Sequence, residues 1–386
     1  MAERPRVLVV VGTRPEGIKL APVVRALEAH ADAVETRVVL TGQHTDLLDQ
    51  ALEVFDLSVD WDLGIMREGQ DLYDVAQGCL SGLRPILGEY RPDLVLVQGD
   101  TATVLFAALA AFFERIMVGH VEAGLRSGDN WQPYPEEIFR RLAGGIADLH
   151  FAPTQQARAN LLGEGVPAER VFLTGNTVVD ALLSIGERDR PVTSPALREA
   201  LAEGRRLVLV TAHRRESFGA PLREVFQAIR LLADRHADTV FLYPVHPNPN
   251  VRGPAEELLA GHPRIRLIAP LDYADLAVAL RHATLVLTDS GGIQEEAPSF
   301  GTPVLVLREV TERPEGVSAG VARLVGTGRD RILQAADELL SDEAARRAMA
   351  TARNPYGDGQ AARRIADIVV HRLTGRPRET ADWEAG

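Results

Sequence analysis

Three carboxylates, Asp100, Glu122 and Glu136, are the clearest sign of chemistry in this sequence. Asp100 and Glu122 follow predicted buried strands, and Glu136 follows the turn 133–135. Because ligands bind beyond the carboxyl ends of the strands in an open parallel sheet, we expect these side chains near a ligand. Converging carboxylates repel one another, which raises some of their pKa values and suits them to proton transfer. A metal site is the competing interpretation, although no histidine spacing favours it.

Basic residues after the first predicted strand could hold an anion. Arg14 and Lys19 flank a predicted helix start, where cations oppose the helix dipole and need a reason to be present. Lys19 is also the one lysine among 42 basic residues, which indicates a need for a compact ammonium, with chance retention as the plain alternative. Segment 12–19 matches neither the GxGxxG fingerprint nor a P-loop, so neither an NAD enzyme nor an ATPase is favoured.

A glycine-rich turn in the second half of the chain also follows a predicted strand. Ser290, Gly291 and Gly292 join this strand to a helix, and the two glycines would let a phosphate approach the backbone. Glu296 follows in the first turn of that helix. It could bind ribose hydroxyls, although a carboxylate there also complements the helix dipole.

Length and composition bound the class of protein. The 386 residues predict two or three domains, and the net charge of −12 argues against a general nucleic-acid binder. Cys79 is the one cysteine, which excludes an intrachain disulfide and a cysteine-based zinc cluster. The apolar run 101–113 is too short to span a bilayer, and residues 1–6 do not resemble a signal peptide. We therefore predict a cytoplasmic protein without membrane or nucleic-acid partners.

Short apolar runs alternate with helix-period segments in both halves of the chain. The predicted strands are 6–11, 35–40, 94–98, 116–121, 149–151 and 171–173, and then 207–211, 239–244, 265–268, 285–288, 303–307 and 323–325. Their nearly continuous apolar character is typical of parallel sheets that are buried on both faces. The polar segment 190–195 contains two prolines and predicts a domain junction. We expect an α/β fold of two Rossmann-like, doubly wound domains that face a cleft.

Eight short motifs occur together in a fixed order. They are GTRPE (12–16), TGQH (41–44), QGDT (98–101), HVEAGLR (120–126), PEE (135–137), HRRES (213–217), DSGGIQEE (289–296) and TERPE (311–315). Each motif alone is modest, but the ordered set is highly specific. It resembles the bacterial non-hydrolysing UDP-N-acetylglucosamine 2-epimerases, and the resemblance extends from about Val7 to Arg372.

The resemblance implies a glycosyltransferase-B-like fold in which the C-terminal helix returns to the first domain. It places the N-terminal domain, with the acid/base carboxylates, at 1–180 plus about 362–386. The C-terminal, UDP-binding domain is then 195–361. It further implies a homodimer that works without a metal or a nicotinamide cofactor.

The activity implied by the resemblance is the reversible conversion of UDP-GlcNAc to UDP-ManNAc. The reaction begins with anti elimination of UDP across C1–C2, which leaves 2-acetamidoglucal and UDP bound. UDP then adds back while a proton is delivered to the other face of C2. Acid/base groups are needed on both faces, which several carboxylates satisfy better than one.

The resemblance also implies roles for individual residues. The candidate catalytic residues are Asp100, Glu122, Glu136 and His213. The candidate UDP-binding residues are Arg14, Lys19, Ser290, Gly291, Gly292, Glu296 and Arg313. A second, activating UDP-GlcNAc would be bound by Gln43, Gln70, Arg214 and His246.

Three positions depart from the family pattern. Asp46 and Gly69 stand where some members have Gln and Arg, which concerns the activating site. Phe139 stands where the family usually has Asn. Its ring could approach Glu136 and desolvate that carboxyl, or it could point into the helix packing behind the site.

Other functions remain as alternatives. A hydrolysing epimerase would release ManNAc and UDP, and its sequence would be very similar. A glycosyltransferase of the same fold would need an acceptor, and the three carboxylates argue against it. A catalytically inactive sugar-nucleotide sensor is a further alternative, with Phe139 as its mark.

Overall fold

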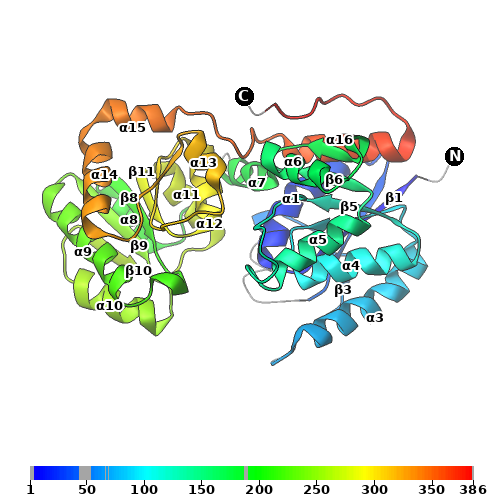
Figure 1. Ribbon diagram of the computed structural model, residues 1–386, viewed down its shortest axis with the longest axis horizontal. Helices are drawn as coiled ribbons and strands as arrows, with labels where there is room; N and C mark the ends of the chain where they lie inside the picture. Colours follow the sequence, from blue (N-terminus) through cyan, green and yellow to red (C-terminus); the bar gives the residue numbers. More distant parts are fainter. Residues whose placement is uncertain (1–3, 43–53, 66, 68, 187–189, 385–386) are drawn as a thin grey trace. The chain divides into compact units, whose positions relative to one another are not determined.

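The computed structural model describes the chain except for residues 1–3, 43–53, 66, 68, 187–189 and 385–386. The chain divides into two compact units (Figure 1). Unit 1 comprises Met1–Ala181 and Gly357–Gly386, and unit 2 comprises Leu182–Tyr356. Each unit is built around its own parallel sheet, so the predicted α/β class is confirmed.

Unit 1 contains a seven-stranded parallel sheet with the order β3-β2-β1-β4-β5-β6-β7. The strands are β1 (Arg6–Val11), β2 (Glu35–Leu40), β3 (Trp61–Asp62), β4 (Leu94–Gln98), β5 (Met117–Val121), β6 (Leu149–Ala152) and β7 (Val171–Leu173). All of them except β3 match predicted apolar runs. β3 has two residues and one of them is charged, so it carries no apolar pattern that could have been recognised.

The helices of unit 1 cover its sheet. They are α1 (Arg14–Glu28), α3 (Leu72–Tyr90), α4 (Ala102–Phe113), α5 (Glu136–Ile146), α6 (Gln155–Gly163), η1 (Ala168–Arg170) and α16 (Ala361–Thr374), and α7 (Thr177–Gly186) begins in this unit. The C-terminal helix α16 packs Ile365 and Val369 into the same buried cluster as Leu20 and Val24 of α1. The predicted return of the C-terminal helix to the first domain is therefore confirmed.

Unit 2 contains a six-stranded parallel sheet with the order β10-β9-β8-β11-β12-β13. Its strands are β8 (Arg206–Thr211), β9 (Thr239–Pro244), β10 (Ile265–Ile268), β11 (Ala283–Thr288), β12 (Val304–Val306) and β13 (Ala322–Leu324). Its helices are α8 (Pro195–Ala202), η2 (Arg215–Ser217), α9 (Ala220–Arg235), α10 (Pro249–Leu259), α11 (Tyr273–His282), α12 (Gly291–Glu296), η3 (Ala297–Phe300), α13 (Pro314–Ser318), α14 (Arg329–Ser341) and α15 (Glu343–Ala350).

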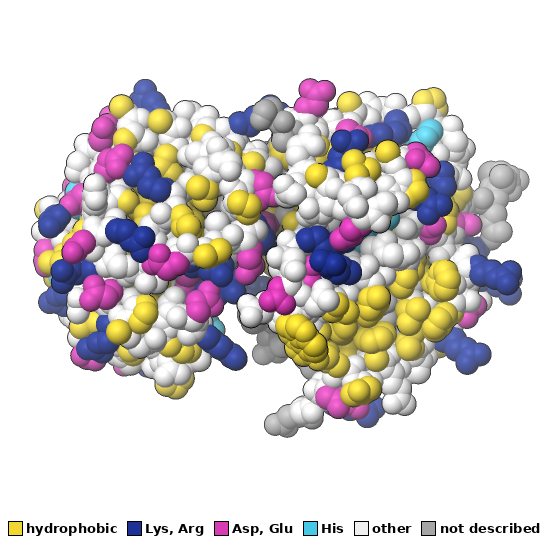
Figure 2. Space-filling view, viewed as in Figure 1, with side chains coloured by type: hydrophobic (Ala, Val, Ile, Leu, Met, Phe, Trp, Pro, Cys, Tyr) yellow, Lys and Arg dark blue, Asp and Glu magenta, His cyan; other side chains and the backbone are white. Residues whose placement is uncertain are grey.

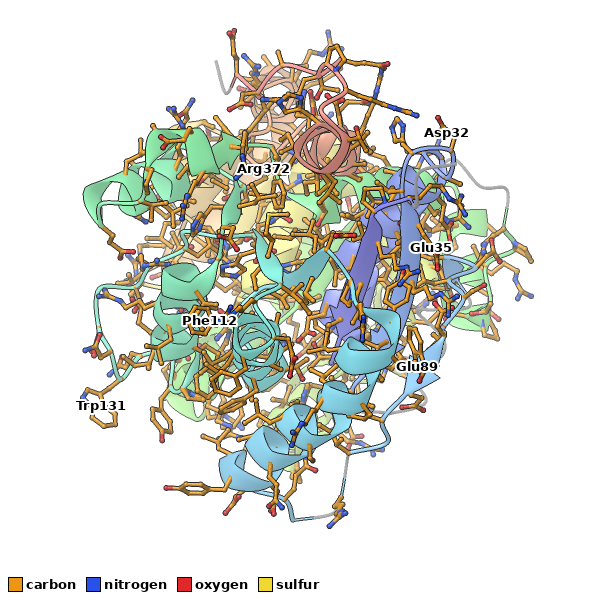
Figure 3. All side chains as sticks on the ribbon, turned by 90° about the vertical axis from the view of Figure 1, so that its right-hand side faces the viewer. Asp32, Glu35, Glu89, Phe112, Trp131 and Arg372 are labelled. Atoms are coloured by element: carbon orange, nitrogen blue, oxygen red, sulfur yellow. The ribbon has the colours of Figure 1, made fainter. Side chains whose placement is uncertain are left out.

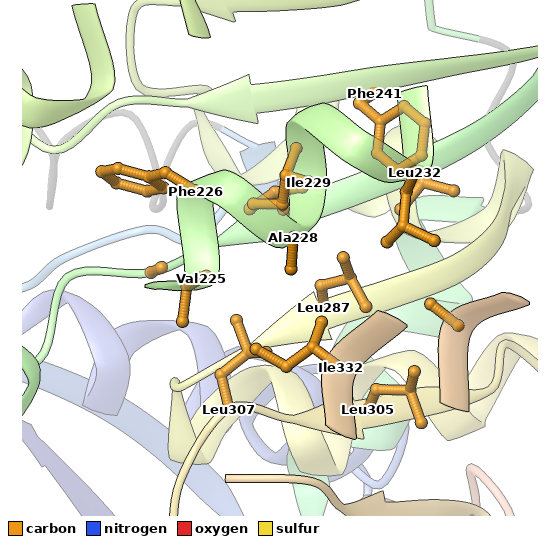
Figure 4. Close-up of a cluster of buried hydrophobic side chains, with 14 of the residues drawn as sticks. Val225, Phe226, Ala228, Ile229, Leu232, Phe241, Leu287, Leu305, Leu307 and Ile332 are labelled. Atoms are coloured by element: carbon orange, nitrogen blue, oxygen red, sulfur yellow. The ribbon is translucent and has the colours of Figure 1, made fainter. Parts of the chain in front are cut away.

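The core of unit 2 lies where α9 and α14 cover one face of the sheet. Phe226 and Ile229 of α9 belong to the same buried cluster as Leu287 of β11, Leu305 of β12 and Ile332 of α14 (Figure 4). This packing holds the carboxyl ends of β8 and β11, after which the candidate residues of unit 2 follow. Among the described helices, none combines the length and the apolar character needed to cross a membrane.

Candidate active site

Asp100 and Glu122 lie at the carboxyl ends of two neighbouring strands of unit 1. β4 and β5 pair in parallel with Gln98 opposite Val121, so the residues that follow them leave the same edge of the sheet. The backbone of Glu122 is left-handed, with φ of 63°. Such a conformation costs a non-glycine residue on the order of 1–3 kcal/mol and is concentrated at functional sites.

Glu122 is held by an ammonium and an amide. Its Oε2 atom accepts hydrogen bonds from Nζ of Lys19 at 2.5 Å and from Nε2 of Gln98 at 2.9 Å. The side chains of Glu122 and Lys19 are only 8% and 18% exposed. The predicted contact of Lys19 with a phosphate stays a prediction, whereas the structure shows its ammonium on a candidate catalytic carboxylate.

Asp100 is paired with a cation that the sequence did not single out. Nη2 of Arg140 on α5 donates to Oδ2 of Asp100 at 2.5 Å. Burial raises the pKa of Asp100 above its usual value, and the nearby charge of Glu122 acts in the same direction. The charges of Arg140 and Lys19 oppose this rise.

Glu136 is the first residue of α5, and one of its carboxylate oxygens lacks a donor. Its Oε2 atom is buried and accepts no hydrogen bond from any described residue. A buried oxygen of this kind is uncommon in folded proteins and is consistent with a catalytic role for Glu136. The neighbouring Glu137 is different, because the backbone N–H of Ser127 and Nε of Arg141 both donate to it at 3.0 Å.

Two further buried side chains stabilise the loops that carry these residues. Glu16 is 2% exposed and accepts hydrogen bonds from Gly12 N at 2.6 Å and from the Thr101 hydroxyl at 2.7 Å, which ties the first loop to the Asp100 loop. Nε2 of His120 lies 2.7 Å from the carbonyl oxygen of Gly99. Burial lowers the pKa of His120 to about 4, so the imidazole is neutral and donates from Nε2.

Phe139 lies in the packing between helices. It is 9% exposed and belongs to a buried cluster with Val75 and Cys79 of α3 and Leu105 of α4. Its ring meets that of Phe106 edge to face at 6.2 Å. Of the two alternatives for Phe139, the structure therefore supports a core residue behind the site.

In unit 2, His213 lies beside a buried carboxylate. Oδ2 of Asp289, which is 1% exposed, accepts the backbone N–H groups of His213 at 2.6 Å and of Arg214 at 2.8 Å. Nδ1 of His213 lies 3.5 Å from Oδ1 of the same carboxylate. The imidazole also stacks on His246, with ring centroids 5.4 Å apart. Burial lowers the pKa of His213, the Asp289 carboxylate opposes this effect, and His246 and Arg214 add to it.

The glycine-rich turn opens α12 in the same unit. Ser290 is its N-terminal cap residue, and a Cβ atom on Gly291 would lie 3.7 Å from the Arg214 guanidinium. At Gly292 it would lie 3.7 Å from Oε1 of Glu296. Nε of Arg313 forms an ion pair with the buried Glu295. The structure thus gathers these candidate UDP-binding residues on one edge of unit 2.

The other candidate residues make fewer contacts that bear on the site. Arg14 is the half-buried first residue of α1, and Gln70 accepts the backbone N–H of Arg67 at 2.7 Å. Gln43 lies outside the described residues. No group of three or more His, Cys, Asp or Glu side chains in the described part of the chain is arranged to hold a metal ion.

Comparison with known proteins identifies the family. The family model for UDP-N-acetylglucosamine 2-epimerase matches residues 25–370. A UDP-N-acetylglucosamine 2-epimerase of Yersinia pestis is 52% identical over 377 aligned residues, which cover 96% of this chain and 100% of that protein.

Solved structures agree with the sequence relatives. The S. aureus MnaA–UDP structure has a TM-score of 0.88 and 42% identity, covering 98% of this chain and 100% of that one. The UDP-GlcNAc 2-epimerase of Neisseria meningitidis bound to UDP-GlcNAc has a TM-score of 0.84 and 40% identity, and the match covers 95% of this chain and 99% of that one. This chain belongs to the UDP-N-acetylglucosamine 2-epimerase family.

Proposed function

We propose that this protein interconverts UDP-GlcNAc and UDP-ManNAc and does not release ManNAc. The observation that carries the proposal is the set of three carboxylates in unit 1, Asp100, Glu122 and Glu136, in a chain that belongs to this family. Asp100 and Glu122 each contact a cation, and Glu136 has a buried oxygen without a donor among the described residues. Relatives of the chain were solved with UDP-GlcNAc and with UDP, which supports the same substrate class here.

The proposed reaction proceeds by elimination and re-addition. One carboxylate removes the proton from C2, the C2–H electrons form the C1–C2 double bond, and the C1–O bond breaks with its electron pair leaving on UDP. The diphosphate oxygen then attacks C1 of 2-acetamidoglucal, while C2 takes a proton on the opposite face. Asp100, Glu122 and Glu136 are the proposed proton handlers, and His213 would stabilise the departing UDP.

The two halves of the chain would divide this work. We assign the acid/base carboxylates to residues 1–180 plus about 362–386 and UDP binding to 195–361. The residues proposed to hold UDP are Arg14, Lys19, Ser290, Gly291, Gly292, Glu296 and Arg313. An activating UDP-GlcNAc would use Gln43, Gln70, Arg214 and His246, and absence of activation in a substrate titration would contradict that assignment.

The test of the function separates it from both alternatives. Purified protein is incubated with UDP-GlcNAc, a chelator and no nicotinamide cofactor, and the anomeric protons are followed by NMR. We expect UDP-ManNAc to appear and the mixture to settle with both UDP-sugars intact. Equimolar UDP and free ManNAc would instead indicate a hydrolysing enzyme, and unchanged substrate would indicate an inactive binding protein.

A homodimer is proposed on the family resemblance and on one surface of unit 1. Large hydrophobic side chains are exposed on neighbouring helices of this unit, namely Leu72 and Tyr73 of α3, Phe112 and Phe113 of α4 and Leu142 of α5. Figure 2 shows hydrophobic side chains gathered over these helices. In Figure 3, Phe112 lies on the same side of unit 1 as Trp131, which is 73% exposed. Apolar patches of this kind mark association surfaces.

Charge on this surface should separate the subunits. We expect wild-type protein to sediment at about twice the 42.0 kDa of one chain, and the double variant Phe112→Glu, Phe113→Glu to sediment as a monomer. Leu231→Glu, at an exposed apolar position of α9 in unit 2, is the control and should remain dimeric. A wild-type monomer, or a dimer unaffected by the double substitution, would contradict the proposal.

A further inference from the structure

Arg140 lies between the carboxylates of Asp100 and Glu137 in unit 1. The proposed reaction gives it no part in proton transfer or in UDP binding. Its side chain is 13% exposed, with Nη2 2.5 Å from Oδ2 of Asp100 and Nη1 3.4 Å from Oε2 of Glu137. Its Nε atom is buried and has no acceptor in the part of the chain that the structure describes. Burying a guanidinium costs desolvation free energy, which its ion pairs with Asp100 and Glu137 offset.

The helix that carries Arg140 also carries a proposed proton handler. Glu136 and Arg140 are four residues apart on α5, so their side chains leave the same face of the helix. Glu137 anchors the first turn of α5, because it is fully buried and accepts hydrogen bonds from Ser127 N and from Arg141 Nε. A chain of contacts therefore runs from the 127 loop through Glu137 and Arg140 to Asp100.

We propose that Arg140 is a positioning residue that holds the Asp100 carboxylate through its ion pair and fixes the distance of that carboxylate from the helix bearing Glu136. The kinetic part of this inference rests on the proposed epimerase function. Arg140 takes no proton itself, since a guanidinium stays charged throughout the working range of pH. It acts through Asp100, which would accept the proton from C2 as a carboxylate.

The charges around Asp100 set the direction of the expected effect. The groups that face it are Arg140 from α5, Lys19 from α1 and Glu122 from the end of β5. Burial and Glu122 raise the pKa of Asp100, and Arg140 and Lys19 lower it. Removing Arg140 takes away one of the charges that counteract the effect of burial, so the pKa of Asp100 should rise further. Asp100 is then ionised only at higher pH, so the acidic limb of the pH–rate profile must move to higher pH.

The kinetic test compares two adjacent arginines. Arg140→Met removes the contact with Asp100. Arg141→Met is the control because Arg141 donates to Glu137 at 3.0 Å, whereas among the described residues the ion pair to Asp100 comes from Arg140. We expect Arg140→Met to move the acidic limb of kcat/KM upward by about one pH unit or more, while UDP affinity stays near wild type. Arg140→Lys should shift the acidic limb less than Arg140→Met does, because lysine keeps the positive charge. Arg141→Met should leave the acidic limb where it is in wild type.

A second readout does not depend on activity. Protein labelled with ¹³C at the aspartate carboxyl carbons is titrated by NMR, and the Asp100 signal is assigned by its absence in Asp100→Asn. We expect this signal to titrate at higher pH in Arg140→Met than in wild type. If Arg140→Met does not fold, Arg140→Lys is compared with wild type in the same titration and should show a smaller upward change.

The outcomes separate this inference from the proposed function. Wild-type protein without epimerase activity would overturn the function, and the NMR titration would still test the charge relation between Arg140 and Asp100. An active wild type whose acidic limb and Asp100 titration are unchanged by Arg140→Met would overturn the inference alone. Equal upward shifts in Arg140→Met and Arg141→Met would also overturn it, because the effect would then come from the anchoring of α5.

Discussion

Asp100→Asn and Glu136→Gln are each expected to lower turnover on the order of 10²-fold or more while UDP affinity stays close to that of wild type. Both substitutions preserve the shape of the side chain and remove its ability to take or give a proton. Glu136→Gln should perturb local structure little, because Oε2 of Glu136 accepts no hydrogen bond from any residue that the structure describes. Steady-state kinetics in both directions and calorimetric UDP binding measure the two quantities.

Asp148→Asn provides the matched control for these two substitutions. Asp148 precedes β6 and accepts the backbone N–H of Val118 at 3.0 Å, so it lies at the amino end of the strands, away from the candidate site. We expect its variant to keep turnover within about threefold of wild type. If Asp100→Asn or Glu136→Gln lost UDP binding in proportion to turnover, the residue would position substrate and would not transfer a proton.

Lys19→Arg is expected to weaken turnover at least about tenfold, which corresponds to roughly 1.4 kcal/mol. Nζ of Lys19 lies 2.5 Å from Oε2 of Glu122, and Gln98 donates to the same oxygen. A planar guanidinium is larger than an ammonium and donates in a fixed fork, so it cannot reproduce this contact in a site where Lys19 is 18% exposed. Steady-state kinetics with both UDP-sugars measure the loss.

The control for Lys19 is the reverse exchange on the same helix. Arg25 on α1 forms an exposed ion pair with Asp56 at 2.9 Å, and its side chain is 41% exposed. Arg25→Lys should leave turnover unchanged, because exposed ion pairs contribute little. If Lys19→Arg kept activity within twofold of wild type, position 19 would not require an ammonium, and the retention of a lysine there would be due to chance.

Much of the framework could be predicted because apolar runs and strand ends are local features. The buried strands β1 and β4 are nearly continuous in Val and Leu, Asp100 lies two residues after β4, and Glu122 directly follows β5. The order of strands in a parallel sheet then brings their ends to one edge. The two-residue β3 carries no such pattern and was missed.

The partners of the site residues could not be predicted, because they connect distant positions. Arg140 reaches Asp100 across 40 positions and Glu16 reaches Thr101 across 85, and a single sequence contains no information on such pairs. Arg140 had one usable signal, since it lies four positions after Glu136, which is about one turn of a helix. The position of Phe139 was left open between two alternatives because helical spacing alone does not show which neighbour a ring meets.

The most direct test of the central claim follows the C2 proton. The protein is incubated with UDP-GlcNAc in D₂O, and the C2 proton of both UDP-sugars is followed by NMR. Elimination removes this proton and re-addition supplies one from groups that exchange with solvent, so deuterium should appear at C2 as UDP-ManNAc forms. Formation of UDP-ManNAc that retains protium at C2 would contradict the account.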